Sequence, residues 1–369
     1  MNVLIACGFI AFIVCAAAMP LAVKLSRRLG AVSETGGRHI GSKPIGRLGG
    51  GGVLFAILSS VFLIIVSVPT VRSGFYDVQR KMIGLSLGLI VVATIGFWDD
   101  IRRLPAFLKF IGQIIAASFA YFFGLKISGV DLPFIEPVQL GFFSFPVTAL
   151  WIIGIVNAVN LIDGLDGLAG GVVLFAGIVN LTAALVSGAF VPAVLMVAMV
   201  GSILGFLLFN WHPAKIYLGD GGAYSIGFIL SISGLLAPVQ KASTGIALLV
   251  PLIAMGLPIF DTLLTMLRRY MSDRGIFSPD RGHLHHILFD AGISHRRVVI
   301  GLYLVCCVLC SIALIMVLKR NMRVGGILIV LSLIGVVLWG WSVKSQLSRV
   351  IAGVFRFESA PERRSDELK

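Results

Sequence analysis

Asparagine and aspartate residues gather at the end of an apolar run in residues 157–171, NAVNLIDGLDGLAGG. Asn160, Asp163 and Asp166 are three residues apart, so successive helical turns are expected to bring them to one side of a helix end. Gly164 and Gly167 would break or bend that end and let a flat or anionic ligand approach the backbone. Because Asn and Asp also cap helices and Gly often ends them, one such residue alone would not indicate a site. The presence of the whole set at one membrane face favours a functional site.

Acidic residues also stand at the ends of other apolar runs. Asp99 and Asp100 close the run that ends GFWDD, and Asp220 in KIYLGDGG precedes another; Asp261 in PIFDTL lies near the end of a further run. A carboxylate is costly in hydrocarbon, so it stays where it is hydrated, paired or bound to a metal. Carboxylates that converge at one surface would repel one another unless a divalent cation and nearby Lys or Arg neutralise them. Hard oxygen ligands favour Mg²⁺ or Mn²⁺ over Zn²⁺, and Mg²⁺ often completes its shell with phosphates, which indicates phosphate chemistry.

Basic residues accompany these acids. Asp99 and Asp100 are adjacent and would point about 100° apart on a helix, which predicts one carboxylate on a metal or structural partner and the other as a base. Lys109 lies near the start of the next apolar run and suits a phosphate, although a lysine there also commonly snorkels to the interface. In the glycine-rich loop RHIGSKPIGRLGGGG, Lys43 and Arg47 are expected to meet lipid headgroups or substrate.

A cluster of histidines stands in a late basic loop, in the motif DRGHLHH. His283, His285 and His286, with Arg274 and Arg281 nearby, suit contacts to a pyrophosphate or its developing charge. The sequence contains neither HExxH nor GxxxxGK[ST], so a zinc hydrolase and a P-loop are poorly supported. The remaining histidines are interpreted as surface residues: His39, His212 and His295.

The composition requires a membrane protein, because 58% of the 369 residues are hydrophobic and only 13% are charged. A spanning helix needs about 20 mostly apolar residues. The expected fold is an all-α polytopic integral membrane protein, with one transmembrane domain at 1–341 and a polar cytoplasmic tail at 342–369. Eleven segments qualify as spans: 3–23, 49–68, 82–98, 106–125, 147–162, 169–187, 191–209, 221–237, 245–266, 298–318 and 324–341.

Charge orients these spans. With the loop 24–48 in the cytoplasm and alternate crossings, 22 of the 30 Lys and Arg residues fall on the cytoplasmic side. The positive-inside rule then predicts the N-terminus outside and the C-terminus inside. The net charge of +13 is explained in this way, without a nucleic-acid partner. The acidic motifs would share the cytoplasmic face, and the outer loop 126–146 is expected to form a short hairpin or an irregular cap.

The motifs GFWDD, NAVNLIDGLDGLAGG, KIYLGDGG, PIFDTL and DRGHLHH, in this order, resemble the polyprenyl-phosphate N-acetylhexosamine-1-phosphate transferase family, glycosyltransferase family 4. That family starts O-antigen, enterobacterial common antigen and teichoic acid synthesis, and it includes the phospho-MurNAc-pentapeptide translocase. The resemblance implies a bundle of ten or eleven helices in the bacterial inner membrane, with a cytoplasmic active-site cleft. It also implies transfer of a sugar-1-phosphate from a UDP-N-acetyl sugar to undecaprenyl phosphate, with release of UMP.

The resemblance assigns roles to particular residues. Asp99 is implied as the base or positioner for the lipid phosphate, and Asp166 as a contact to uracil. The implied catalytic residues are Asp99, Asp100, Asp163 and His283; the implied substrate-binding residues are Lys109, Asp166, Arg281, His285 and His286; the implied Mg²⁺ ligands are Asn160 and Asp220. Mn²⁺ is the alternative ion. The implied partners are the UDP-sugar, undecaprenyl phosphate and membrane lipid; a homodimer is left open.

Several alternatives stay open. Gly221 and Ala223 stand where the family often has hydroxyl residues, which puts any hydroxyl contact there in doubt. The spacing of His283, His285 and His286 is more similar to the O-antigen and teichoic-acid initiators than to the translocase, so GlcNAc-1-phosphate is preferred over the MurNAc-pentapeptide donor. Direct attack is favoured over an aspartyl-phosphate intermediate. A transporter is the rival of a different class, but its site would lie near the bilayer midplane.

Overall fold

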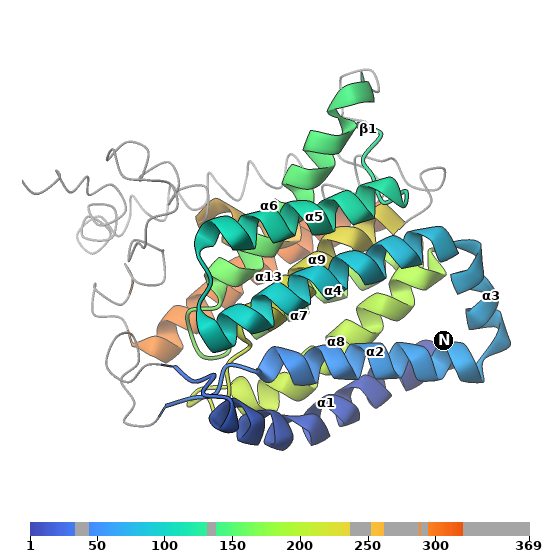
Figure 1. Cartoon of the computed structure of the whole chain (residues 1–369). Coiled ribbons are helices and arrows are strands. Elements are labelled where there is room, and N and C mark those ends of the chain that lie inside the picture. The colour runs from blue at the N-terminus through green and yellow to red at the C-terminus, as the bar shows by residue number, and fades with distance from the viewer. Residues whose placement is uncertain (34–43, 131–137, 237–251, 262–287, 289–293, 320–369) are drawn as a thin grey trace, which may run out of the picture.

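The computed structural model describes residues 1–33, 44–130, 138–236, 252–261, 288 and 294–319, which form a bundle of helices with one small hairpin (Figure 1). The elements are α1 (Asn2–Arg28), α2 (Gly49–Ser67), α3 (Pro69–Asp77), α4 (Gln79–Arg102), α5 (Ala106–Phe122), β1 (Gly129–Val130), β2 (Val138–Gln139), the 3-10 turn η1 (Gly141–Phe143), α6 (Ser144–Ile162), α7 (Leu168–Val186), α8 (Phe190–Asn210), α9 (Gly219–Leu236) and α13 (His295–Lys319). Residues 252–261 are mainly helical as well.

The helices confirm the prediction of an all-α polytopic membrane protein. Seven of the described helical segments are long and apolar enough to cross a membrane, and α5 is a shorter apolar helix. Nine of the eleven predicted spans coincide with described helices, α5 and α9 among them. The span predicted at 324–341, most of that at 245–266, and the tail at 342–369 lie outside the described residues. One helix was not expected, because α3 occupies a segment predicted as an outer loop.

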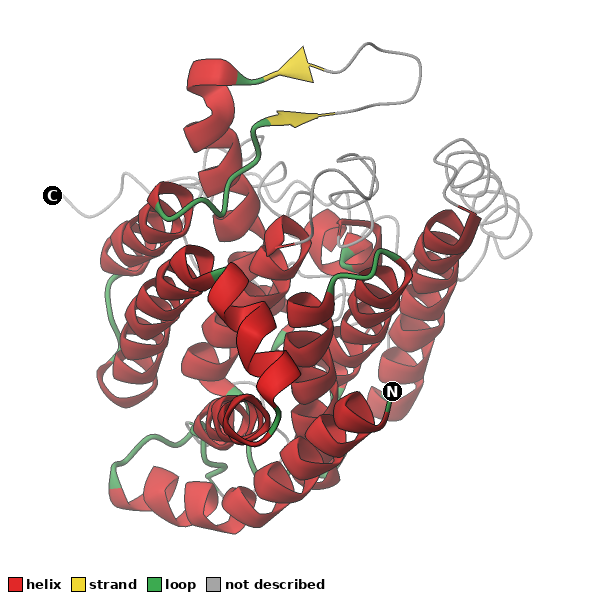
Figure 2. Cartoon of the chain, turned by 90° about the vertical axis from the view of Figure 1, so that its right-hand side faces the viewer, coloured by secondary structure: helices red, strands yellow, loops and turns green. Residues whose placement is uncertain are grey.

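The loop predicted to form a hairpin does so. Strand β1 pairs with β2 in antiparallel register, Gly129 opposite Gln139 and Val130 opposite Val138. Figure 2 shows these two strands at one end of the molecule, beside the start of the helix that follows them, α6.

Helix α9 forms the centre of the bundle. Nearly all of its residues are buried, and it packs against α2, α4 and α6. Glycines make this close approach possible: a Cβ atom on Gly50 would overlap the backbone of Gly222, and one on Gly96 would overlap the backbone of Gly221. Small residues at helix interfaces are typical of membrane proteins, where packing replaces the hydrophobic effect. These contacts fix the start of α9 between the start of α2 and the end of α4.

The chain reverses direction repeatedly, so helix ends and helix starts alternate at one end of the bundle. Helices α4, α6 and α8 end there, while α5, α7, α9 and α13 begin there, on the left in Figure 1. The large apolar side chains on the outside of the bundle, such as Phe55, Phe62 and Leu150, are exposed. This apolar outer surface is suited to contact with lipid. The polar residues of the motifs lie at the end of the bundle where these helices end and begin.

Candidate active site

Acids from two helices meet one lysine at this end. Asp99 lies in the last turn of α4, and Asp220 lies in the first turn of α9. Lys109 of α5 donates through Nζ to Asp99 Oδ2 at 2.7 Å and to Asp220 Oδ2 at 2.9 Å. One ammonium group therefore bridges the two acids, and Lys109 itself is 111 positions from Asp220 in the chain. Acids from separate helix ends therefore meet beside a basic residue, as the sequence predicts, at Asp99 and Asp220.

Asp100, next to Asp99, has different partners. Its Oδ1 accepts the backbone N–H of Asp220 at 2.9 Å, and its Oδ2 accepts that of Gly221 at 3.0 Å. The first N–H groups of a helix have no partner within the helix, so Asp100 caps α9 from a neighbouring helix. Gly219 makes the preceding turn with φ of +74°. The side chain of Asp100 is fully buried, at 0% exposed, and its contacts are those of a positioning residue.

Arg47 joins the acids from the other side. Its Nη2 lies 3.3 Å from Asp220 Oδ1 and 3.5 Å from Asp100 Oδ1. The sequence indicated only that Arg47 would meet headgroups or substrate, because nothing in a basic, glycine-rich loop identifies which arginine reaches the acids. We call Asp99, Asp100, Asp163 and Asp220, with Arg47 and Lys109, the carboxylate cluster.

Asp163 belongs to this cluster through the end of α6. The helix ends at Ile162, and Asp163 leaves helical geometry with φ of −77° and ψ of 58°. Burial raises the pKa of its carboxyl to about 7, and the negative charge of Asp220 adds to the shift, while Arg47 and the N–H of Gly219 oppose it. These causes place Asp163 beside the start of α9.

The expectation that Asn160, Asp163 and Asp166 share one side of a helix end is wrong. Only Asn160 is helical, in the last turn of α6, where it is partly buried. Asp163 and Asp166 lie in the turn that follows, because the two glycines end the helix sooner than the spacing suggested. Asn160 remains a prediction as a metal ligand.

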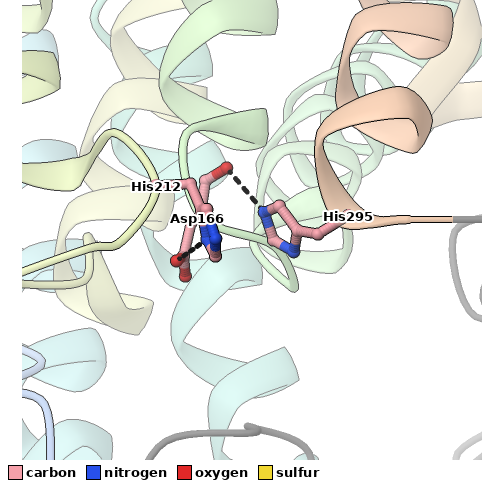
Figure 3. Close-up of side chains that lie close together, drawn as sticks. All are labelled: Asp166, His212 and His295. Atoms are coloured by element: carbon pink, nitrogen blue, oxygen red, sulfur yellow. Dashed lines mark hydrogen bonds and ion pairs between the residues drawn. The ribbon is translucent and has the colours of Figure 1, made fainter.

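Asp166 lies in a second group of polar residues, shown in Figure 3. Its Oδ2 accepts the backbone N–H of Ala214 at 3.1 Å and lies 2.8 Å from Nδ1 of His212. Nε2 of His295 lies 3.4 Å from the main-chain oxygen of Asp166, and the two imidazole rings stack with centroids 4.4 Å apart. We call Asp166, His212 and His295 the Asp166 cluster. Both histidines were interpreted as surface residues; His212 does keep 38% of its side chain exposed, but both rings contact Asp166, which the sequence did not predict.

The turn that carries Asp166 is tied to two other helices. Gly167 has φ of +79°, donates its N–H to Asn210 Oδ1 at 3.0 Å and accepts the hydroxyl of Tyr303 at 2.6 Å. The amide of Asn210 also donates to the carbonyl of Ile216 at 2.9 Å. Sequence reasoning missed Asn210, although a buried amide that closes an apolar run is the same signal that singled out Asn160.

The two clusters offer different donors to a metal. The carboxylate cluster supplies only oxygen atoms, with two cations beside them, and this donor set fits Mg²⁺ or Mn²⁺. In the Asp166 cluster one ligand atom from each residue lies within 4.8 Å of the others. There, however, His212 faces the carboxylate and His295 faces the backbone, so the group already forms a hydrogen-bonded network.

Arg281, His283, His285 and His286 lie outside the described residues, so their roles stay predictions. Asp261 is described and buried.

Known proteins are similar to this chain, and the family match covers Asp99, Asp163 and Asp220. Residues 82–237 match the model of glycosyl transferase family 4. A probable undecaprenyl-phosphate N-acetylglucosaminyl 1-phosphate transferase of Bacillus subtilis is 34% identical over 78% of this chain and 77% of its own length. The chain belongs to glycosyl transferase family 4. The predicted family is thereby confirmed.

Other members of the family are also similar to this chain. A decaprenyl-phosphate N-acetylglucosaminephosphotransferase of Mycobacterium tuberculosis is 35% identical over 76% of this chain and 74% of its own length. A phospho-N-acetylmuramoyl-pentapeptide-transferase of Aquifex aeolicus is 30% identical over 70% of this chain and 78% of its own length.

Proposed function

We propose that this protein transfers N-acetylglucosamine-1-phosphate from UDP-N-acetylglucosamine to undecaprenyl phosphate. An oxygen of the lipid phosphate bonds to the phosphorus that carries the sugar. The bond from this phosphorus to the oxygen between the two phosphorus atoms breaks, and UMP leaves with that oxygen. The observation that carries the proposal is the bridge of Lys109 between Asp99 and Asp220 at the shared helix ends, in a chain whose relatives bear this activity in their names.

The described side chains suit the reacting groups. Lys109 and Arg47 are 23% and 28% exposed, so both can reach an anionic diphosphate that arrives from outside the bundle. Asp99, held by Lys109 and by the N–H of Leu104 at 2.6 Å, would orient the lipid phosphate and accept its proton. Asp100 would keep the start of α9, and hence Asp220, in place.

A divalent cation completes this proposal. Asp220, together with Asn160, would hold Mg²⁺ or Mn²⁺ beside the carboxylate cluster. Such an ion stabilises the charge that develops on a transferring phosphoryl group. The permanent cations of Lys109 and Arg47 would act on the same charge in a site with little water, where electrostatic stabilisation is strong. His283, His285, His286 and Arg281 are proposed to bind the pyrophosphate.

The proposal places the reaction at the cytoplasmic face of a bacterial inner membrane, where it would start a cell-envelope glycan. The side is supported by the excess of Lys and Arg in the connections at the end of the bundle that holds the cluster. We further propose direct attack, because the carboxylate of Asp99 is already engaged by two donors.

The test is an assay of UMP release by the purified full-length protein with Mg²⁺, undecaprenyl phosphate and a panel of UDP-sugars. UMP is expected with UDP-N-acetylglucosamine, and its release should stop when EDTA is added. UMP release only with the UDP-MurNAc-pentapeptide would instead support the pentapeptide-type reaction. No UMP with any donor, together with solute flux in vesicles, would support a carrier. Exchange of labelled UMP into the donor without lipid would contradict direct attack.

A further inference from the structure

Both oxygens of Asp220 face a cation supplied by the protein itself. Lys109 Nζ lies 2.9 Å from Oδ2, and Arg47 Nη2 lies 3.3 Å from Oδ1. The carboxylate is 13% exposed, so a ligand can reach it. A divalent cation bound to either oxygen of Asp220 would therefore lie close to one of these two positive charges.

Arg47 is built into this position by its backbone. Its N–H donates to the carbonyl of Ala31 at 2.9 Å, and the carbonyl of the preceding Gly46 accepts the N–H of Tyr217 at 2.7 Å. The next residue, Leu48, donates its N–H to the buried hydroxyl of Ser26 at 3.2 Å. Hydrogen bonds thus hold the loop that carries Arg47 between the end of α1 and the segment that leads into α9. The guanidinium is nevertheless 28% exposed, so its tip can move while its backbone stays fixed.

Two opposing interactions act at Asp220. A divalent cation there would be repelled by the nearby guanidinium, which is always charged. A diphosphate would attract the guanidinium away from Asp220, because Arg binds phosphate oxygens with a fork of N–H donors. Binding of the diphosphate should then lower the cost of binding the cation, and the reverse must hold by linkage.

We propose that Arg47 is a placeholder cation that couples the binding of a divalent cation at Asp220 to the binding of the donor's diphosphate. The proposal rests on the proposed function for the identity of the diphosphate. Arg47 is the positioning residue in this coupling: it weakens the binding of the cation alone and favours the pair. If Arg47 only neutralised Asp100 and Asp220, its removal would leave the effect of UDP on Mn²⁺ binding unchanged.

The experiment measures Mn²⁺ binding to the purified full-length protein by EPR of free Mn²⁺, with and without UDP, after subtraction of the Mn²⁺–UDP complex measured without protein. For Arg47→Gln, Mn²⁺ without UDP should bind about five- to tenfold more tightly than to the unchanged protein. UDP should tighten Mn²⁺ binding to the unchanged protein by a similar factor and have less effect on the variant. Arg47→Met, which keeps the apolar stem, carries the same test if Arg47→Gln does not fold.

Two further variants make the outcomes distinguishable. Arg80→Gln is the matched control, because Arg80 bonds the carbonyl of Phe122 away from the cluster, and it should leave Mn²⁺ binding unchanged. Asp220→Asn should abolish the Mn²⁺ site. Equal or weaker binding to both Arg47 variants, with the site still lost in Asp220→Asn, would overturn this inference and leave the proposed function standing. Full Mn²⁺ binding to Asp220→Asn would overturn this inference and the proposed role of Asp220 as a metal ligand, while loss of UMP release with every donor would overturn the proposed function.

Discussion

The carboxylate cluster and the Asp166 cluster lie at the same end of the bundle but neutralise their acids differently. In the first, Arg47 and Lys109 pair with buried carboxylates. In the second, a single carboxylate faces an imidazole and a backbone N–H, in the stacked arrangement of Figure 3. Permanent cations prepare a site for highly charged ligands, whereas dipoles and imidazole suit a neutral planar group. The difference indicates that one donor molecule would place its diphosphate and its base in separate surroundings.

The two clusters also differ in how their positions are fixed. The carboxylate cluster depends on helix ends packed through glycines, with Asp100 holding the first turn of α9. The Asp166 cluster depends on a turn between α6 and α7 that is tied down by Asn210 and Tyr303. A substitution in the first should therefore affect the chemical step, and one in the second should affect binding of the donor.

The largest effect is expected from Asp220→Asn. Loss of the carboxylate that pairs with both Lys109 and Arg47 should lower the rate of UMP release on the order of a thousandfold. Asp77→Asn, at the end of α3, is the matched control and should keep the full rate. A rate above one tenth of that of the unchanged protein would argue against a central role for Asp220.

The variants Asp99→Asn and Asp100→Asn should distinguish the roles of two neighbouring carboxylates. Asp100→Asn should lower the midpoint of thermal unfolding by several degrees, because a charged cap of α9 is lost, and should lower the rate about ten- to a hundredfold. Asp99→Asn should lower the rate at least as much without lowering the midpoint. Thermal melts in detergent and UMP release check both, and equal midpoints for the two variants would contradict the different roles.

His212→Phe should have a smaller effect of a different kind. The substituted ring can still stack on His295 but has no nitrogen that faces Asp166. The KM for the UDP-sugar should rise about tenfold while kcat stays within about threefold, since uniform binding is lost. Steady-state kinetics check this, and a fall in kcat at unchanged KM would move Asp166 into the chemical step.

The smallest effect concerns Asp163 and pH. Its pKa is raised to about 7, so the folded protein binds this proton more strongly than the unfolded chain does. That contribution to stability is present at low pH and is lost as pH rises through about 7. In EDTA, Asp163→Asn should therefore raise the melting midpoint by a few degrees at pH 8 and leave it unchanged near pH 5. Thermal melts at both values test the sign, and a gain only at pH 5 would contradict it.

The sequence predicted what depends on local pattern. The positions of the spans, the hairpin and the shared end of the acidic motifs follow from apolar length, turn residues and charge placement. The pairing of Arg47 with Asp220 does not, because it depends on glycine contacts between α2, α4 and α9 that bring together residues 173 positions apart. His212 was missed for the same reason: its partner, Asp166, is 46 residues earlier, and a histidine after an apolar run has no local signal.

The turn after α6 shows a different limit. Regular spacing of Asn160, Asp163 and Asp166 suggested one helical side, but spacing has that meaning only while the helix continues. The glycines of the motif were expected to break or bend the helix end, and the helix stops before Asp163. The point at which the helix ends determines which cluster each aspartate joins. That point depends on tertiary contacts, such as the one between Asn210 and Gly167.

Anomalous scattering of Mn²⁺ in crystals grown with UDP tests the assignment of Asp220 and Arg47 most directly. A peak is expected about 2.0–2.2 Å from a carboxylate oxygen of Asp220, with the guanidinium of Arg47 turned toward the diphosphate. A peak among Asp166, His212 and His295, or a bound diphosphate with no peak near Asp220, would contradict it.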